Sequence, residues 1–264
     1  MKGICFFDLD GTLLYDKDDI VPESALRGLS LLKENGYIVC LATGRDMDTH
    51  YSRKYKEIVK PNAIIHHNGT KITINGELVF EHFMDRELLE RALSFAQKEN
   101  ICMGTSVGDF DYFTLPELKT AADLCYKKES VRNYRPITEL FEKNIPVSAL
   151  SVAAPDVSLI KDRVEEGVPE LELFMFDGRT GADCVERGFS KADGMKRVCA
   201  HYGIDIKDTY AFGDSENDIP MLKAAGTGVA MGNAAASVKE EADFVTAAIA
   251  DDGIYKALCH LSLI

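Results

Sequence analysis

The sequence lacks the features that would tie it to a nucleic acid or a charged membrane. Its 264 residues hold 30 Lys and Arg against 43 Asp and Glu, a formal net charge of -13, and no run rich in Lys or Arg interrupts this acidic balance. Nucleic acids and anionic membranes are themselves negative, so we expect the chain to bind neither. A small anion stays compatible with the composition, provided that Lys side chains, backbone N–H groups or a metal reverse the field locally.

Long apolar runs and paired cysteines are also missing. No run approaches the ~18 apolar residues of a membrane-spanning helix, and Asp8 comes too early for the apolar region of a signal peptide. The seven cysteines are dispersed and form no C-x-x-C pair, which favours buried thiols in a reducing compartment. These absences predict a cytoplasmic protein, and they leave its oligomeric state unknown.

Several common site motifs do not occur. The chain has no G-x-x-x-x-G-K-[ST] phosphate loop and no G-x-S-x-G nucleophile elbow. A calcium loop that began at Asp8 would need Gly at its sixth position, where Leu13 stands. The glycines of 226–232 have the wrong spacing for a dinucleotide loop and overlap an expected strand. The sequence therefore favours none of these four kinds of site.

Alternating strands and helices are what the sequence does contain, and 46% hydrophobic residues suffice for a sizeable core. Apolar runs predict buried strands at 4–7, 37–42, 63–65, 209–212 and 228–231. Helical patterns fall between them, in a stripe that Pro22 opens and at 46–58, 191–202, 217–225 and 251–261. Asn75-Gly76 predicts a hairpin turn between 71–74 and 77–80. This order is typical of an α/β fold with a parallel sheet.

The pattern changes between Met84 and Glu186. An amphipathic helix over 88–96 precedes expected strands at 101–107, 111–115, 147–153 and 171–176, with helices near 117–128 and 156–165. We therefore predict an α/β protein in which residues 1–83 and 187–264 form a Rossmann-like parallel-sheet core domain and residues 84–186 form an inserted α+β domain.

Polar residues gather where the core strands end, which is where open α/β sheets bind ligands. They are Asp8, Asp10, Thr43, Asp214, Asn217 and Asp218, with Lys191 at the start of a helix. Taken singly, each is also what a turn or a helix start contains. Asp8 and Asp10 start on one side of a strand, and close carboxylates repel each other unless a cation lies between them. Together these groups fit Mg²⁺ and a phosphate.

Four segments stand in the order and spacing of the haloacid dehalogenase superfamily: DLDGTLL at 8–14, ATGR at 42–45, GFSK at 188–191 and GDSENDIPML at 213–222. The chain resembles the Cof-type phosphatase branch, as do its segments HHNG at 66–69, VAMGNA at 229–234 and DDG at 251–253. In position and length, residues 84–186 are similar to the large α/β cap domain of that branch. Ser215 departs from the Gly that often follows the Asp of the last motif.

The resemblance implies two catalytic residues, Asp8 as a nucleophile that forms an aspartyl-phosphate and Asp10 as the acid and base. It implies Mg²⁺ on the carboxylates of Asp8 and Asp214 and on the main-chain carbonyl of Asp10, with Asp218 orienting a water on the metal. The implied phosphate-binding residues are Leu9, Thr43, Gly44, Lys191 and Asn217.

The resemblance implies a Mg²⁺-dependent phosphatase that acts on a small phosphorylated metabolite, with a sugar phosphate as the expected substrate. A phosphomutase of the same superfamily and a non-catalytic phosphosugar sensor are the alternatives. The sensor would be natural had Asp8 or Asp10 been lost, and both are present. Release of free phosphate would separate the three.

Overall fold

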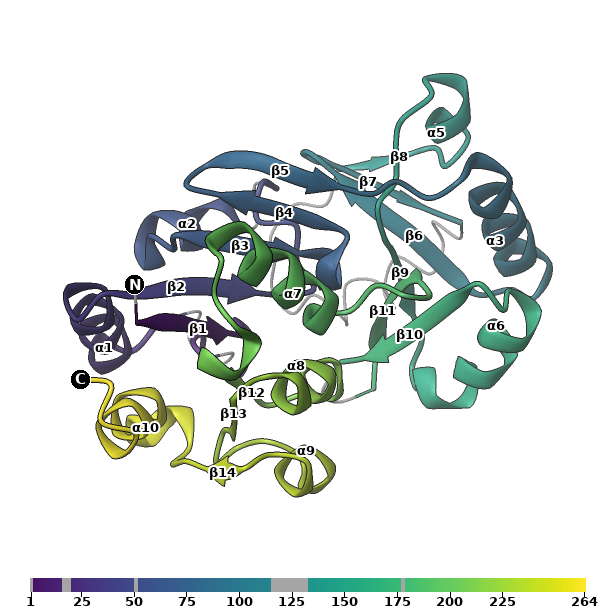
Figure 1. Cartoon of the computed structure of the whole chain (residues 1–264). Helices are drawn as coiled ribbons and strands as arrows, with labels where there is room; N and C mark the ends of the chain where they lie inside the picture. Colours follow the sequence, from purple (N-terminus) through teal and green to yellow (C-terminus); the bar gives the residue numbers. More distant parts are fainter. Residues whose placement is uncertain (1, 16–19, 50–51, 115–132, 177–178) are drawn as a thin grey trace. The chain divides into compact units, whose positions relative to one another are not determined.

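The computed structural model describes residues 2–15, 20–49, 52–114, 133–176 and 179–264 (Figure 1). The chain forms two compact units. The first comprises Met1–Arg45, Tyr55–Phe80 and Phe189–Ile264, and the second comprises Asp46–Lys54 and Glu81–Gly188. Asp46–Lys54, which we expected in the core domain, thus groups with the second unit. The domain boundaries at residues 84 and 186 stay a prediction.

The first unit contains an eight-stranded sheet in the order β14-β13-β12-β1-β2-β3-β4-β5. Neighbours from β14 to β3 are parallel, and β4 is antiparallel to β3. The strands are β1 (Gly3–Phe7), β2 (Tyr37–Ala42), β3 (Ala63–His66), β4 (Lys71–Ile74), β5 (Glu77–Glu81), β12 (Thr209–Gly213), β13 (Thr227–Ala230) and β14 (Phe244–Val245). The predicted parallel-sheet α/β fold is confirmed.

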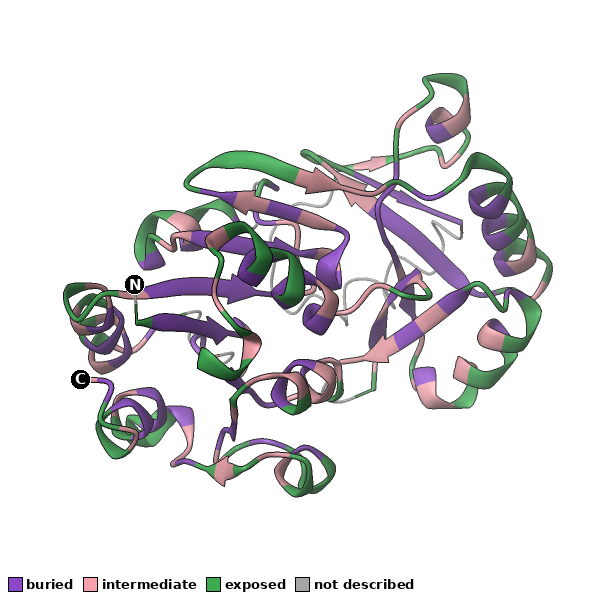
Figure 2. Ribbon diagram, in the orientation of Figure 1, coloured by how far each residue is buried: buried purple, intermediate pink, exposed green. Residues whose placement is uncertain are grey.

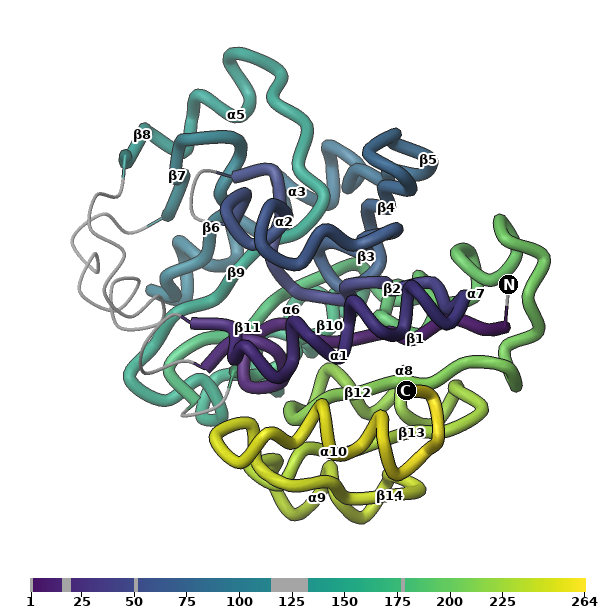
Figure 3. Tube along the Cα trace, turned by 90° about the vertical axis from the view of Figure 1, so that its left-hand side faces the viewer, coloured from purple at the N-terminus to yellow at the C-terminus, as the bar shows by residue number. Residues whose placement is uncertain are grey.

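The central strands are buried on both faces, as their continuous apolar runs require. All five residues of β1 are buried, and Figure 2 shows most of β1 and β2 in the colour of buried residues. The helices of this unit are α1 (Glu23–Glu34), α7 (Lys191–Tyr202), α8 (Ile219–Ala224), α9 (Ala236–Glu240), α10 (Gly253–His260) and, from Tyr55 onward, α2 (Arg53–Val59). α1 packs beside α10 (Figure 3). At this contact the guanidinium of Arg27 lies over the ring of Tyr255.

Three expected helices differ from the structure at their ends. The helix predicted over 46–58 begins only at Arg53, because polar side chains bond the backbone before it: Asp46 accepts the N–H of Asp48, and the hydroxyl of Thr49 donates to the Asp46 carbonyl. Pro22 stands just before α1 rather than inside it. The helix predicted over 217–225 is a 3₁₀ turn at Glu216–Asp218 followed by α8.

The second unit contains a six-stranded sheet in the order β10-β11-β9-β6-β7-β8. Its strands are β6 (Cys102–Val107), β7 (Phe110–Phe113), β8 (Tyr134–Arg135), β9 (Leu150–Ala153), β10 (Leu171–Met175) and β11 (Gly181–Glu186). Its helices include α3 (Arg86–Lys98), α5 (Glu139–Glu142) and α6 (Lys161–Gly167). The predicted α+β character is confirmed, whereas β11 was not predicted. The helix expected near 117–128 lies outside the described residues.

Candidate active site

The candidate site lies at the carboxyl ends of β1, β2 and β12. Phe7, the last residue of β1, is in register with Leu41 of β2 and with Phe212 of β12. The ring of Phe7 stacks on that of Phe212 with centroids 4.6 Å apart, and the Asp8 N–H donates to the Phe212 carbonyl at 2.9 Å. This register places the residues that follow the three strands at one edge of the sheet.

Lys191 is the most buried cation of the site. Ser190 caps α7 by accepting the Asp193 N–H, so Lys191 is the first residue of the helix, yet its side chain is 0% exposed. Its ammonium donates to Asp8 Oδ1 at 2.5 Å and to Asp218 Oδ1 at 2.6 Å. Burial alone would lower the pKa of Lys191, but these two carboxylates outweigh it and hold that pKa above its ordinary value. The alternative of a solvated helix-start residue is therefore wrong.

The two carboxylates that Lys191 contacts belong to a group of three. Asp8, Asp214 and Asp218 each offer an oxygen, and these oxygens lie within 4.8 Å of one another. Burial raises the pKa of Asp8 well above its ordinary value, against the opposing charge of Lys191. Burial and the charge of Asp218 raise the pKa of Asp214 to about 8, although the Thr12 hydroxyl donates to it at 2.9 Å. The single positive charge of Lys191 does not balance three carboxylates. Because all the potential ligand atoms of this group are carboxylate oxygens, it fits a hard divalent cation.

Asp218 already has hydrogen-bond donors on both of its oxygens. Oδ1 accepts from Lys191, and Oδ2 accepts the backbone N–H groups of Asp214 and Ser215 at 2.9 and 3.0 Å. Gly213 lets the loop close this tightly, because a Cβ there would lie 2.4 Å from the Cβ of Asp218. Asp218 therefore shapes the loop that carries Asp214.

Asp10 is held by a residue that sequence reasoning did not single out. Nε and Nη2 of Arg45 donate to its two carboxylate oxygens, each at 2.7 Å. The ring of Tyr55 lies against the same guanidinium, 5.7 Å from centroid to Cζ. The side chain of Asp10 is thus not part of the three-carboxylate group. Arg45 belongs to the segment ATGR, at the end of β2. This position was the one feature of the sequence that could have marked Arg45 as a site residue.

The remaining expected residues lie around this edge. Thr43 is buried, and its hydroxyl accepts a hydrogen bond from the backbone N–H of Arg45. Gly44 is the residue between them, so it lies within this short turn. Asn217 donates from Nδ2 to Asn68 Oδ1 at 3.1 Å. The side chain of Leu9 is fully buried and its carbonyl accepts from Leu13 and Leu14. Leu9 can therefore meet a ligand only through its backbone.

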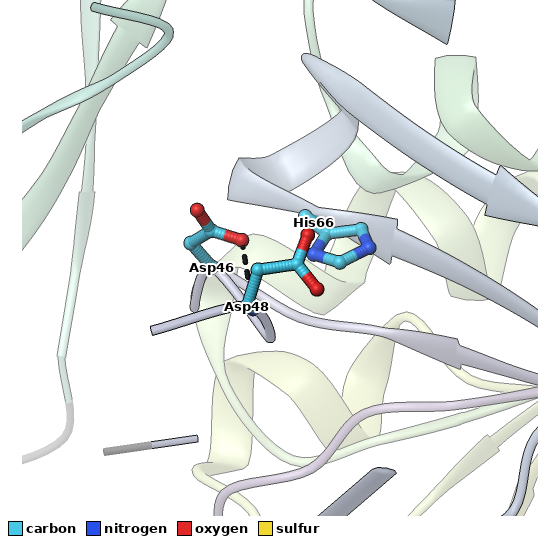
Figure 4. A group of neighbouring side chains, drawn as sticks. All are labelled: Asp46, Asp48 and His66. Carbon is cyan, nitrogen blue, oxygen red and sulfur yellow. Dashed lines mark hydrogen bonds between the residues drawn. The ribbon is translucent and has the colours of Figure 1, made fainter. Parts of the chain in front are cut away.

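Figure 4 draws the side chains of Asp46, Asp48 and His66. The dashed line is the hydrogen bond from the Asp48 N–H to the Asp46 carboxylate. The two aspartates belong to the second unit and His66 to the first, where His66 Nε2 lies 3.1 Å from the Thr73 hydroxyl. Among the helices of the described ranges, none combines the length and the hydropathy that a membrane span requires.

Comparison with known proteins gives a family match over most of the chain. Residues 5–258 match the family described as haloacid dehalogenase-like hydrolase. The putative phosphatase YkrA of Bacillus subtilis is 31% identical over 265 residues, which cover 99% of this chain and 98% of that protein. The 5-amino-6-(5-phospho-D-ribitylamino)uracil phosphatase YitU of the same organism is 26% identical, and the match covers 95% of this chain and 94% of YitU.

Solved structures agree with the sequence match. The structure of the sugar phosphatase BT4131, of haloacid dehalogenase subclass IIB, superposes with a TM-score of 0.87. The two chains are 26% identical, and the match covers 99% of this chain and 100% of the other.

Proposed function

Since the chain belongs to the haloacid dehalogenase-like hydrolase family and is a phosphoric monoester hydrolase, we propose that it hydrolyses a small phosphorylated metabolite. The reaction uses Mg²⁺ and passes through an aspartyl-phosphate on Asp8. One observation carries this proposal: the buried contact between Lys191 and Asp8 inside a group of three carboxylates. A carboxylate that keeps one oxygen on a cation has its other oxygen available for attack on phosphorus.

Lys191 counters the charge repulsion in that attack, since it stands within hydrogen-bond distance of the nucleophile. Mg²⁺ would be held by the carboxylates of Asp8 and Asp214 and the main-chain carbonyl of Asp10, and it would neutralise charge between the nucleophile and the phosphoryl group. The Thr43 hydroxyl, the amide of Asn217 and the backbone N–H groups of Leu9 and Gly44 would bind the phosphate oxygens. The all-oxygen donor set described above supports the metal assignment.

Asp10 supplies the proton transfers. It protonates the departing oxygen of the substrate and then accepts a proton from the water that hydrolyses the aspartyl-phosphate. The Asp10 carboxylate is exposed enough for this exchange, with 38% of its side chain accessible, whereas Asp8 is 7% accessible. This difference in exposure supports the division of roles between the two carboxylates.

The names of the relatives support a sugar phosphate or a similar polyol phosphate as the substrate. One is a sugar phosphatase, and another acts on a compound with a phosphorylated ribityl chain. Both names describe a phosphate on a polyhydroxylated carbon chain. Residues 84–186 would act as the cap domain that selects among such compounds.

The test is release of inorganic phosphate from a panel of sugar and polyol phosphates by the metal-stripped protein, with and without added Mg²⁺. We expect release only with Mg²⁺. Full turnover in EDTA would contradict the metal assignment, and no release from any compound would contradict the function. A phosphomutase would return the phosphoryl group to its substrate without net release.

A further inference from the structure

Asn68 has a buried side chain at the carboxyl end of β3, in a backbone conformation that few residues adopt. It is 1% exposed, with φ 51° and ψ 35°, in the turn His67–Gly69. The left-handed region is unfavourable for most L-residues, and Asn is one of the types that tolerate it. The turn accounts for the backbone conformation of Asn68 but not for the burial of its polar side chain, which costs free energy unless the amide is hydrogen-bonded.

The contacts of Asn68 join two residues proposed to bind phosphate. Its backbone N–H donates to the carbonyl of Thr43 at 3.1 Å. Its Oδ1 accepts from Nδ2 of Asn217 at 3.1 Å, across 149 positions of sequence. The next residue, Gly69, has φ +105°, and a Cβ there would lie 2.3 Å from the carbonyl oxygen of Ser190, just before Lys191. Packing on three sides therefore fixes the turn.

The amide of Asn217 has two orientations that its shape alone does not distinguish. The terminal torsion of Asn is broad and roughly two-fold, so oxygen and nitrogen exchange places easily unless a partner selects one. Asn217 Oδ1 is buried and has no hydrogen-bond partner among the described residues, so the contact with Asn68 Oδ1 is what holds the nitrogen in place. A carbonyl oxygen turned toward a phosphate would repel it, whereas an N–H attracts it.

We propose that Asn68 is a positioning residue, which fixes the Asn217 amide so that its second N–H is available to the substrate phosphate. This inference rests on the proposed function. Asn68 acts through Asn217 and does not itself touch the substrate.

The test is a double-mutant cycle with inorganic phosphate as a competitive inhibitor. Asn68→Gly keeps the left-handed backbone and the bond to Thr43 but removes the acceptor. We expect it to raise KM and the inhibition constant of phosphate roughly 3- to 10-fold, the size of one hydrogen bond. In an Asn217→Ala background, the same change should have less than about a 2-fold effect, because the partner is already gone.

Asn100→Gly is the matched control, because Asn100 has φ 55° but is exposed and lies in the second unit. It should leave KM and phosphate inhibition unchanged. Equal inhibition constants for the parent and Asn68→Gly, or an equal loss in both backgrounds, would overturn the inference. A parent that releases no phosphate from any substrate would instead overturn the proposed function.

A spectroscopic measurement on the unmutated protein does not depend on whether the variants fold. When phosphate is titrated into the parent, one side-chain N–H signal of Asn217 should shift and the other, bonded to Asn68, should stay near its starting position. Shifts of both signals, or of neither, would overturn the assignment.

Discussion

At the scale of single residues, Asp10 carries the most specific chemical assignment. Its carboxylate is the proposed acid and base, while its main-chain carbonyl is a proposed Mg²⁺ ligand. Side chain and backbone can therefore be tested separately, because a substitution to Asn alters only the former.

Asp10→Asn should lower turnover roughly 10²- to 10⁴-fold, the usual worth of general acid–base help. With p-nitrophenyl phosphate the leaving group needs little protonation, so attack by Asp8 should survive better than hydrolysis of the aspartyl-phosphate. Mass spectrometry of an acid-quenched sample should then find phosphate on Asp8. Phosphate on a Ser, His or Cys, or turnover equal to that of the parent, would rule out the mechanism.

Arg45 should matter through the geometry of its two bonds to Asp10. Lys keeps the charge but lacks the planar fork that binds both carboxylate oxygens. Arg45→Lys should lower kcat by about 10-fold, more for an alkyl phosphate than for p-nitrophenyl phosphate, with KM changed less. Arg53→Lys is the control, since Arg53 pairs with Asp109 within the second unit. An equal loss of kcat/KM for both substrates would count against an effect on protonation of the leaving group.

At the scale of elements, the loop after β1 depends on one glycine. Gly11 has φ +80°, and a Cβ there would lie 2.1 Å from Oδ2 of Asp214. The Gly11 carbonyl accepts from Asn233, and Thr12 donates to Asp214. The backbone of this loop therefore lies close against Asp214, a proposed metal ligand. A side chain at position 11 would push Asp214 or the loop out of place.

Gly11→Ala should reduce stability and metal affinity together. The left-handed conformation alone costs about 1–2 kcal/mol for Ala. Gly36→Ala is the matched control, because Gly36 has φ +86° and a Cβ there would meet nothing within 4 Å. Denaturant unfolding should show this backbone cost in both variants and a further loss in Gly11→Ala, whose Cβ would overlap Asp214. Calorimetry should show weaker Mg²⁺ binding only in Gly11→Ala. Equal Mg²⁺ affinity in the two variants would contradict the site.

At the scale of the whole molecule, the charge at the site couples metal binding to stability. Asp8, Asp214 and Asp218 are gathered in the folded chain and dispersed in the unfolded one, and the whole chain carries a formal charge of -13. A cation that binds only the folded state stabilises it by mass action.

Mg²⁺ at about 100 times its Kd should raise the free energy of unfolding by about 2.7 kcal/mol. Thermal unfolding of the metal-stripped protein, followed with and without Mg²⁺, measures this without any turnover. Asp214→Asn should lose most of the increase, because it removes a charged ligand. An identical increase in that variant would place the cation elsewhere.

Local patterns in the sequence were enough to predict the core strands and the ends of α7. The helix expected over 191–202 is confirmed at both ends, because Ser190 supplies an N-cap and Gly203 a left-handed C-cap. β11 was missed because its sequence, GADCVE, has too few apolar residues to predict a strand, and it is formed by pairing with β9 and β10. Pairing partners lie outside any local window.

Strand periodicity and turn residues are local properties, so the amino-acid pattern was enough to predict that carboxylates, a hydroxyl and an ammonium follow the strands of a parallel sheet. Which of these groups touch could be learned only from the folded chain. The contacts that define the site are hydrogen bonds between residues 27 to 183 positions apart in the sequence. They join Lys191 to Asp8 and Asp218, Arg45 to Asp10, and Asn217 to Asn68. Such contacts depend on strand register and on the close approach of backbones, which no spacing along the chain specifies.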